Sequence, residues 1–200
     1  MQHAALLLSL TALGASLLSA QVCRGIAIDT PGWFALELGR AAESATVHGA
    51  GISWQFDQGT FVFASANVTS YERSLPPRGR AAAGAGFPLA KRNRFEVCAT
   101  LGSELERIGD LRVKRIPVGL AMGWAKPLPG VSRGIGLTLE PFFVHQDEHI
   151  RRFAHTSNFL SARTGVVYLR RGWLWGVTYE HAFDADARWN AIARVGFTFN

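Results

Sequence analysis

The feature that most constrains the fold of this chain is a two-residue hydrophobic period. Near the C-terminus, apolar or aromatic residues alternate with small, polar or charged ones along 173–183 and again along 189–199. The same alternation runs through 94–105, 112–126 and 131–146. Successive side chains of a β-strand point to opposite faces, so this pattern predicts strands with one apolar and one polar face. We therefore expect an all-β protein.

Strands of a soluble sandwich alternate in the same way, but three features favour a membrane-spanning barrel. The predicted strands approach the ~9–11 residues that a tilted membrane-spanning strand needs. The polar face consists mainly of Gly, Ala and Thr with isolated charges, which suits a narrow lumen. The apolar face ends in aromatic residues, as an interfacial girdle does; these are Trp124, Trp173, Trp189 and Phe199.

The connections between the strands predict how the barrel is oriented. Short turns on one side and longer loops on the other are typical of an up-and-down transmembrane barrel, with the short turns periplasmic. We expect tight turns at 57–59, 90–93, 127–130 and 171–172, and longer loops at 73–79, 106–111, 147–158 and 184–188.

The strand count is predicted to be ten, an even number that closes an antiparallel barrel with both termini periplasmic. Eight strands is the alternative, because 32–40 and 80–89 are weak, and the lipid-facing side of 60–71 is ambiguous. The ten strands are expected at about 32–40, 46–56, 60–71, 80–89, 94–105, 112–126, 131–146, 159–170, 172–183 and 189–199.

The N-terminus predicts export. Residues 1–20 form an apolar, uncharged run that ends at Leu18-Ser19-Ala20, as a secretory signal peptide does. Residues 21–200 would then form one barrel domain in the outer membrane of a Gram-negative cell, preceded by a short periplasmic segment at 21–31. No later stretch of 18 or more apolar residues offers a spanning helix.

The formal charge of +6 favours contact with the anionic phosphates of outer-membrane lipids and lipopolysaccharide. An exported chain with this patterning is not expected to bind nucleic acid. We expect a monomer without cofactor or metal.

Charges of both signs fall on the face that we expect to line the lumen. Isolated buried charge is prohibitive, so these groups are expected to pair. The hairpins bring Glu180 near Arg194 and Glu140 near Arg163. We interpret the set as an ion-pair network that closes the lumen, and a narrow passive pore is the alternative. The predicted lumen charges are Glu37, Glu96, Glu104, Arg115, Glu140, Arg163, Glu180 and Arg194.

The two cysteines, Cys23 and Cys98, predict a disulfide, because an exported chain with an even cysteine count usually forms one. Such a bond would pin the segment 22–31 against the lower barrel. The cysteines lie far apart in sequence with no His or Cys beside them, which makes a zinc site a poor interpretation.

The chain resembles the small bacterial outer-membrane β-barrel proteins over about residues 21–200. The resemblance rests on the signal peptide, the alternating strands and the final stretch Arg194-Val195-Gly196-Phe197-Thr198-Phe199-Asn200. That ending looks like the signal read by the barrel-assembly machinery, except that Asn200 follows the last aromatic residue. The resemblance implies this machinery as a partner, and it implies a class of fold rather than one activity.

One stretch, His155-Thr156-Ser157-Asn158, is similar to the His-x-Ser-Asn motif of lipid A 3-O-deacylases. The resemblance implies His155 as the base and Ser157 as the nucleophile. The family's orienting Glu falls at Leu169 here, so Glu180 would have to replace it.

Our expectation for this stretch is instead a solvated loop that is rich in basic and histidine residues, including Arg151-Arg152, His145 and His149. We therefore interpret the chain as a non-enzymatic barrel with a structural or surface-interacting role.

Overall fold

The chain folds into a closed antiparallel β-barrel. The structure is a computed structural model that describes Cys23 and residues 32–56, 60–71, 76–129, 133–151, 153–184 and 188–199. Within them, a short 3₁₀ turn (Ala42–Ser44) joins the first two of ten strands. The strands are β1 (Gly32–Ala41), β2 (Ala45–Gln55), β3 (Phe61–Ser70), β4 (Arg78–Arg92), β5 (Phe95–Ile108), β6 (Leu111–Pro127), β7 (Arg133–Ile150), β8 (Phe153–Arg170), β9 (Trp173–Ala182) and β10 (Trp189–Phe199).

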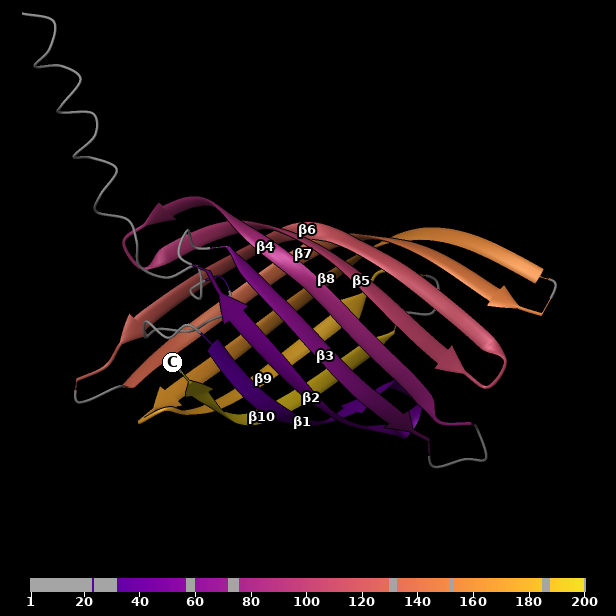
Figure 1. Cartoon of the computed structure of the whole chain (residues 1–200), viewed down its shortest axis with the longest axis horizontal. Coiled ribbons are helices and arrows are strands. Elements are labelled where there is room, and N and C mark those ends of the chain that lie inside the picture. Colours follow the sequence, from indigo (N-terminus) through magenta and orange to yellow (C-terminus); the bar gives the residue numbers. More distant parts are fainter. Residues whose placement is uncertain are drawn as a thin grey trace, which may run out of the picture.

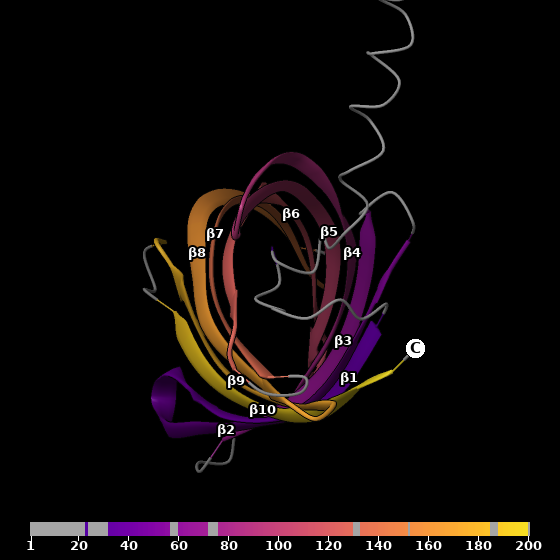
Figure 2. The ribbon, with the colours of Figure 1, turned by 90° about the vertical axis from the view of Figure 1, so that its left-hand side faces the viewer.

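Each strand pairs with its neighbours in sequence, and β1 closes the barrel by pairing with β10. This seam is continuous from Gly32 opposite Phe199 to Ala41 opposite Asn190. Figure 2 shows the closed ring along its axis, and Figure 1 shows the tilt of the strands. The expected barrel of ten strands is confirmed, and the alternative of eight is excluded. Among the described residues there is no helix long and apolar enough to cross a membrane.

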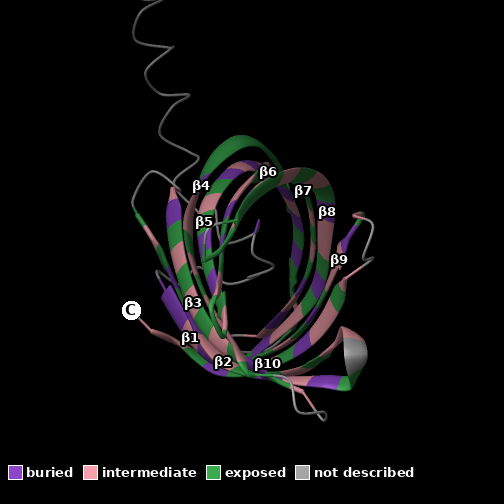
Figure 3. Ribbon diagram, turned by 90° about the vertical axis from the view of Figure 1, so that its right-hand side faces the viewer, coloured by how far each residue is buried: buried purple, intermediate pink, exposed green. Residues whose placement is uncertain are grey.

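The two faces of each strand have opposite character, as the period of two predicts. Exposed and buried residues alternate along the ribbons in Figure 3. The outward face carries large apolar side chains that are exposed, including Leu36, Leu101, Val118, Leu139, Phe143, Leu160, Val177 and Val195. A continuous apolar exterior of this extent is suited to lipid rather than to water. Val62 and Val68 lie on it, which settles the lipid-facing side of β3.

The expected disulfide is confirmed: Cys23 is bonded to Cys98 of β5 across a sequence separation of 75 residues. Both cysteines are fully buried and pack with Phe61 and Ala121. Phe63 lies against this cluster, so the inward face of β3 is apolar at this end. The bond therefore joins Cys23 to the inner wall of the barrel, at the end where β5 begins.

Two expected loops are wrong: 106–111 and 147–158 are mostly strand. β5 and β6 meet at the two-residue turn Gly109-Asp110, and β7 ends at Ile150 while β8 begins at Phe153. Side chains still alternate between the two faces through both stretches, but polar residues occur on both faces, so hydropathy no longer alternates there. That polarity resembles the composition of loops, which is why the sequence predicts loops in these two stretches. The result is a pair of long hairpins that project from one end of the barrel (Figure 1).

Smaller differences occur at β4. It begins at Arg78, inside a predicted loop, and it runs to Arg92, through most of the predicted turn at 90–93. A register shift between Pro88 and Ala90 lets the strand continue past the proline, which cannot donate a ladder hydrogen bond. The turn itself is at Asn93, which has a positive φ of 53°.

Candidate functional site: a charged lumen

Ten charged side chains form ion pairs on the inner face of the described strands: eight belong to one connected network, and Arg194 and Glu37 form a separate pair. Five are arginines and five are glutamates, so the set is neutral overall. Each side chain points inward because its position has the inward parity of its strand. The set comprises Arg78, Arg80, Arg115, Arg163, Arg194, Glu37, Glu104, Glu106, Glu140 and Glu180.

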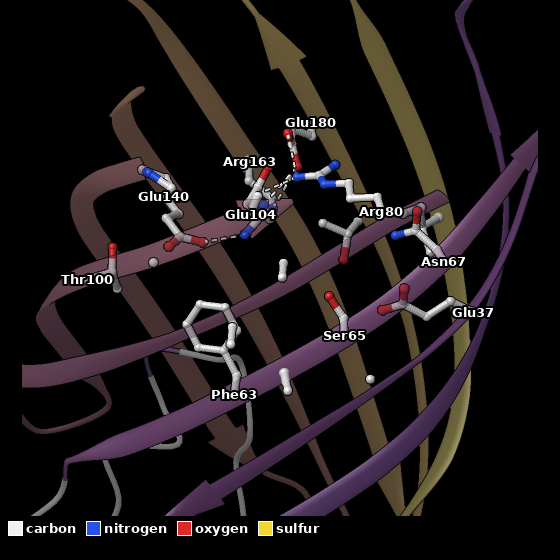
Figure 4. Close-up of a pocket in the computed structure, with 18 of the residues that line it drawn as sticks. Glu37, Phe63, Ser65, Asn67, Arg80, Thr100, Glu104, Glu140, Arg163 and Glu180 are labelled. Carbon is white, nitrogen blue, oxygen red and sulfur yellow. Dashed lines mark hydrogen bonds and ion pairs between the residues drawn. The ribbon is translucent and has the colours of Figure 1, made fainter. Parts of the chain in front are cut away.

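The centre of the network is built around Arg163 and Arg80 (Figure 4). The guanidinium of Arg163 lies 3.1 Å from Glu140 and 2.8 Å from Glu180, and it stacks 5.3 Å above the ring of Phe142. That of Arg80 lies 2.5 Å from Glu104 and 3.8 Å from Glu180. Glu180 is therefore shared between two arginines.

The contact between Arg80 and Glu180 differs in kind from the others, because it crosses the lumen. Arg80 is on β4 and Glu180 is on β9, and these strands lie five steps apart around the ring in either direction. Each of the other ion pairs in the set joins two side chains on neighbouring strands. The barrel is thus bridged across its full width by charged groups.

Toward the projecting hairpins, the network continues through Arg115. Its guanidinium is 2.6 Å from Glu106 and also donates to the amide oxygen of Gln146. Arg78 approaches Glu106 from the other side at 2.5 Å. The Gln146 amide nitrogen donates in turn to Glu148 at 2.6 Å. These contacts tie β4, β5, β6 and β7 together above the centre.

Below the centre, Arg194 pairs with Glu37 at 2.7 Å and donates to the Thr178 hydroxyl at 2.9 Å. Two small cavities of about 70 and 90 Å³ lie in the lumen. Both are lined by Arg80, Glu104 and Glu180, so the central charges separate one cavity from the other. Each holds only a few waters.

Two predicted pairings among the lumen residues have different outcomes. Glu140 and Arg163 are neighbours, as the register of their hairpin predicts, whereas Glu180 contacts Arg163 and Arg80 rather than Arg194. Arg194 lies opposite Glu37 in the β1–β10 register and takes that partner.

Glu96 is buried beside the disulfide, where one carboxylate oxygen has no hydrogen-bond partner among the described residues. Its ligand atoms and those of the cysteines lie close together, but the two sulfurs are bonded to each other and offer no thiolate to a metal.

Three members of the network were missed from the sequence: Arg78, Arg80 and Glu106. Arg78 and Glu106 fall in stretches that we interpreted as loops, and Arg80 falls at the edge of a weak strand. Their spacing in the sequence could have identified them. Arg78 and Arg80 are two residues apart and share one face of a strand, and so do Glu104 and Glu106.

The residues that resemble a hydrolase site do not converge. His155 and Ser157 lie on β8 with inward parity, and among the described residues neither side chain makes a hydrogen bond. Glu180 is the cross-strand partner of Arg163. That position is six residues along β8 from Ser157, which amounts to about 20 Å.

A second group of polar residues on this hairpin faces outward. His145 hydrogen-bonds to Asn158 at 2.8 Å, and the Thr156 hydroxyl donates to Asp147 at 3.0 Å. His149 has the same outward parity as His145, whereas His155 points to the opposite face. The three histidines therefore do not form one group.

Comparisons with known proteins leave the function open. No protein-family model matches the chain, and no curated protein matches it. Similar solved structures include the porin KdgM in complex with disordered oligogalacturonate, at 9% identity and a TM-score of 0.42, covering 84% of this chain and 99% of that one.

Two further similar structures are Omp33, an outer membrane protein of Acinetobacter baumannii, and the outer membrane protease OmpT of Escherichia coli. Omp33 has 10% identity and a TM-score of 0.43, covering 86% of this chain and 100% of its own. OmpT has 9% identity and a TM-score of 0.45, covering 88% and 95%. These neighbours are outer-membrane β-barrel proteins, but such low similarity assigns no activity to this chain.

Proposed function

We propose that this chain is a non-enzymatic outer-membrane β-barrel with a lumen closed by charge pairs, and that its role is structural or surface-interacting. The proposal includes export by a signal peptide at 1–20, which lies outside the described residues. It also includes assembly by the barrel-assembly machinery and contact with lipopolysaccharide.

The observation that carries the proposal is the contact between Arg80 and Glu180 across the width of the barrel. A pore needs a continuous aqueous path, and a bridge at mid-lumen interrupts it. The equal numbers of arginines and glutamates, five of each, also disfavour ion passage. An interior with paired charges has no surface of one charge sign that would attract an ion.

The outward apolar face supports placement in a membrane. It carries exposed side chains on all the strands that line the ring, from Leu36 on β1 to Val195 on β10. Trp124, Trp173 and Trp189 also face outward, near the ends of their strands, as residues of interfacial girdles do.

Current measurement in planar lipid bilayers tests the closed lumen. The wild-type barrel is expected to insert without conductance steps, whereas Arg80→Ala, which removes the bridge to Glu180, is expected to produce them. Arg112→Ala, an outward position on β6, is the matched control and should stay silent. Steady conductance of the wild-type protein would contradict the proposal and favour the narrow pore.

Cell fractionation tests the membrane assignment separately. The protein is expected in the outer membrane and should migrate differently on a gel before and after heating. A water-soluble monomer after removal of residues 1–20 would refute the assignment.

A further inference from the structure

The two strands of the β7–β8 hairpin have unequal neighbours. β7 is paired with β6 up to its last residue, Ile150, which lies opposite Leu111. On its other side, β8 is paired with β9 only from Ser161, opposite Ala182, onward. One further backbone bond, from the Phe183 N–H to the Leu160 carbonyl at 2.8 Å, ends that ladder. The β9-facing edge of 153–159 therefore continues beyond its neighbour.

The last bond of the ladder fixes which backbone groups point into this open edge. In an antiparallel pair, hydrogen-bonded positions recur every second residue. Because Leu160 is bonded toward the β9 side, Asn158, Thr156 and Ala154 direct their N–H and C=O groups the same way. The intervening residues direct theirs toward β7, opposite which they are paired. Six backbone groups thus form a regular row, and no described residue pairs with them.

This edge lacks the devices that protein sheets use against unwanted strand pairing. Such devices are charged side chains, proline and bulges. Residues 153–159 contain no Lys, Arg, Asp, Glu or Pro, and their pairing with β7 is unbroken. Phe153, at the tip, is 78% exposed. An edge of this length without charged side chains, proline or a bulge invites an added strand.

We propose that the β8 edge between Phe153 and Phe159 binds an extended segment of a partner polypeptide by strand addition. Alternating donors and acceptors at this spacing are complementary to an extended peptide backbone, and an added strand would continue the ladder that β9 begins. A partner segment of about six residues matches the ~20 Å of open edge. Beside Phe153, an apolar partner side chain would cover its exposed ring.

A second copy of the barrel in the same membrane fits this edge less well than a separate extended peptide segment does. Two barrels upright in one bilayer are related by an axis along the membrane normal, which makes their β8 strands run in the same sense. The proposal assumes the upright placement proposed above, but its test does not, since binding is measured with the barrel in detergent micelles.

The probe is a fluorescein-labelled heptapeptide of alternating threonine and valine. Its binding to the folded full-length barrel is measured by fluorescence anisotropy. Saturable binding is expected. Thr156→Pro removes one N–H from the open edge without touching the β7 ladder, and it should weaken binding about tenfold, the effect of one lost backbone hydrogen bond. Thr156→Ala loses the same contact to Asp147 but keeps the N–H, so it should bind as wild type.

Two further measurements keep the proposal falsifiable if Thr156→Pro folds poorly. The heptapeptide methylated at every nitrogen should not bind the wild-type barrel. In amide exchange, Thr156 and Asn158 should exchange faster than His155 and Ser157, and addition of the peptide should slow them. Equal binding of the methylated peptide, or prior protection of Thr156 and Asn158, would overturn the proposal. So would a dimer in micelles that Thr156→Pro dissociates, because it would assign the edge to a second copy.

Discussion

Replacing Arg80 by glutamine isolates the energetic role of the bridge. The change takes away the partner of Glu104 at 2.5 Å and the contact with Glu180 at 3.8 Å, and it leaves the network with one excess negative charge. Removing one partner of a buried ion pair costs ~3–5 kcal/mol. Because the Arg80 side chain is still 18% exposed, some water can replace the lost contact, and we expect the lower figure, about 3 kcal/mol.

Urea unfolding followed by tryptophan fluorescence in detergent micelles measures this cost. Arg112→Gln is the matched control, because among the described residues its outward side chain makes no ion pair, and we expect a change within about 0.5 kcal/mol. The double variant Arg80→Gln/Glu104→Gln restores neutrality and should be more stable than Arg80→Gln alone. If Arg80→Gln unfolds at the same urea concentration as Arg112→Gln, the lumen is wet enough to screen its charges and the closed-lumen reasoning is refuted.

Three other changes test separate parts of the structure. Cys98→Ser opens a loop of 75 residues and should lower stability by up to ~4 kcal/mol; equal urea midpoints for wild type with and without reductant would contradict this. Val118→Arg puts a charge on the outward apolar face and should cost ~2–4 kcal/mol in liposomes, while no cost would mean that this face meets water. Burial alone would raise the pKa of Asp184, but the hydrogen bond and charge of Arg188 outweigh it and hold that pKa below its usual range. The contribution of this pair should therefore be complete above the unfolded pKa of about 3.9 and be lost as pH falls through the lower folded value, and Arg188→Gln should return the Asp184 pKa, followed by NMR, to its usual range.

The part of the barrel with an apolar outer face was predictable from the sequence, because there the hydrophobic period of two is strong. Strands such as β9 and β10 were placed within about a residue of their ends. The hairpin of β7 and β8 was not, because toward its tip both faces of each strand carry polar residues and hydropathy no longer distinguishes strand from loop.

The partners of the lumen charges were predictable only between adjacent strands. Cross-strand register follows from hairpin turns, which is how Glu140 and Arg163 were paired. The contact between Arg80 and Glu180 joins strands whose proximity depends on closure of the whole ring, which no local pattern encodes.

The proposed closed lumen and the open β8 edge together indicate that the protein functions through the end that carries the long hairpins. The ion pairs lie between two small cavities, and in the proposed function the interior acts as a brace rather than a path. The long hairpins are not needed to span a bilayer, since β9 and β10 form the same wall with 10 and 11 residues. Arg115, Gln146 and Glu148 stiffen them from within, through contacts that continue the lumen network upward. A braced hairpin that holds an unpaired strand edge away from the barrel is suited to presenting that edge to a partner.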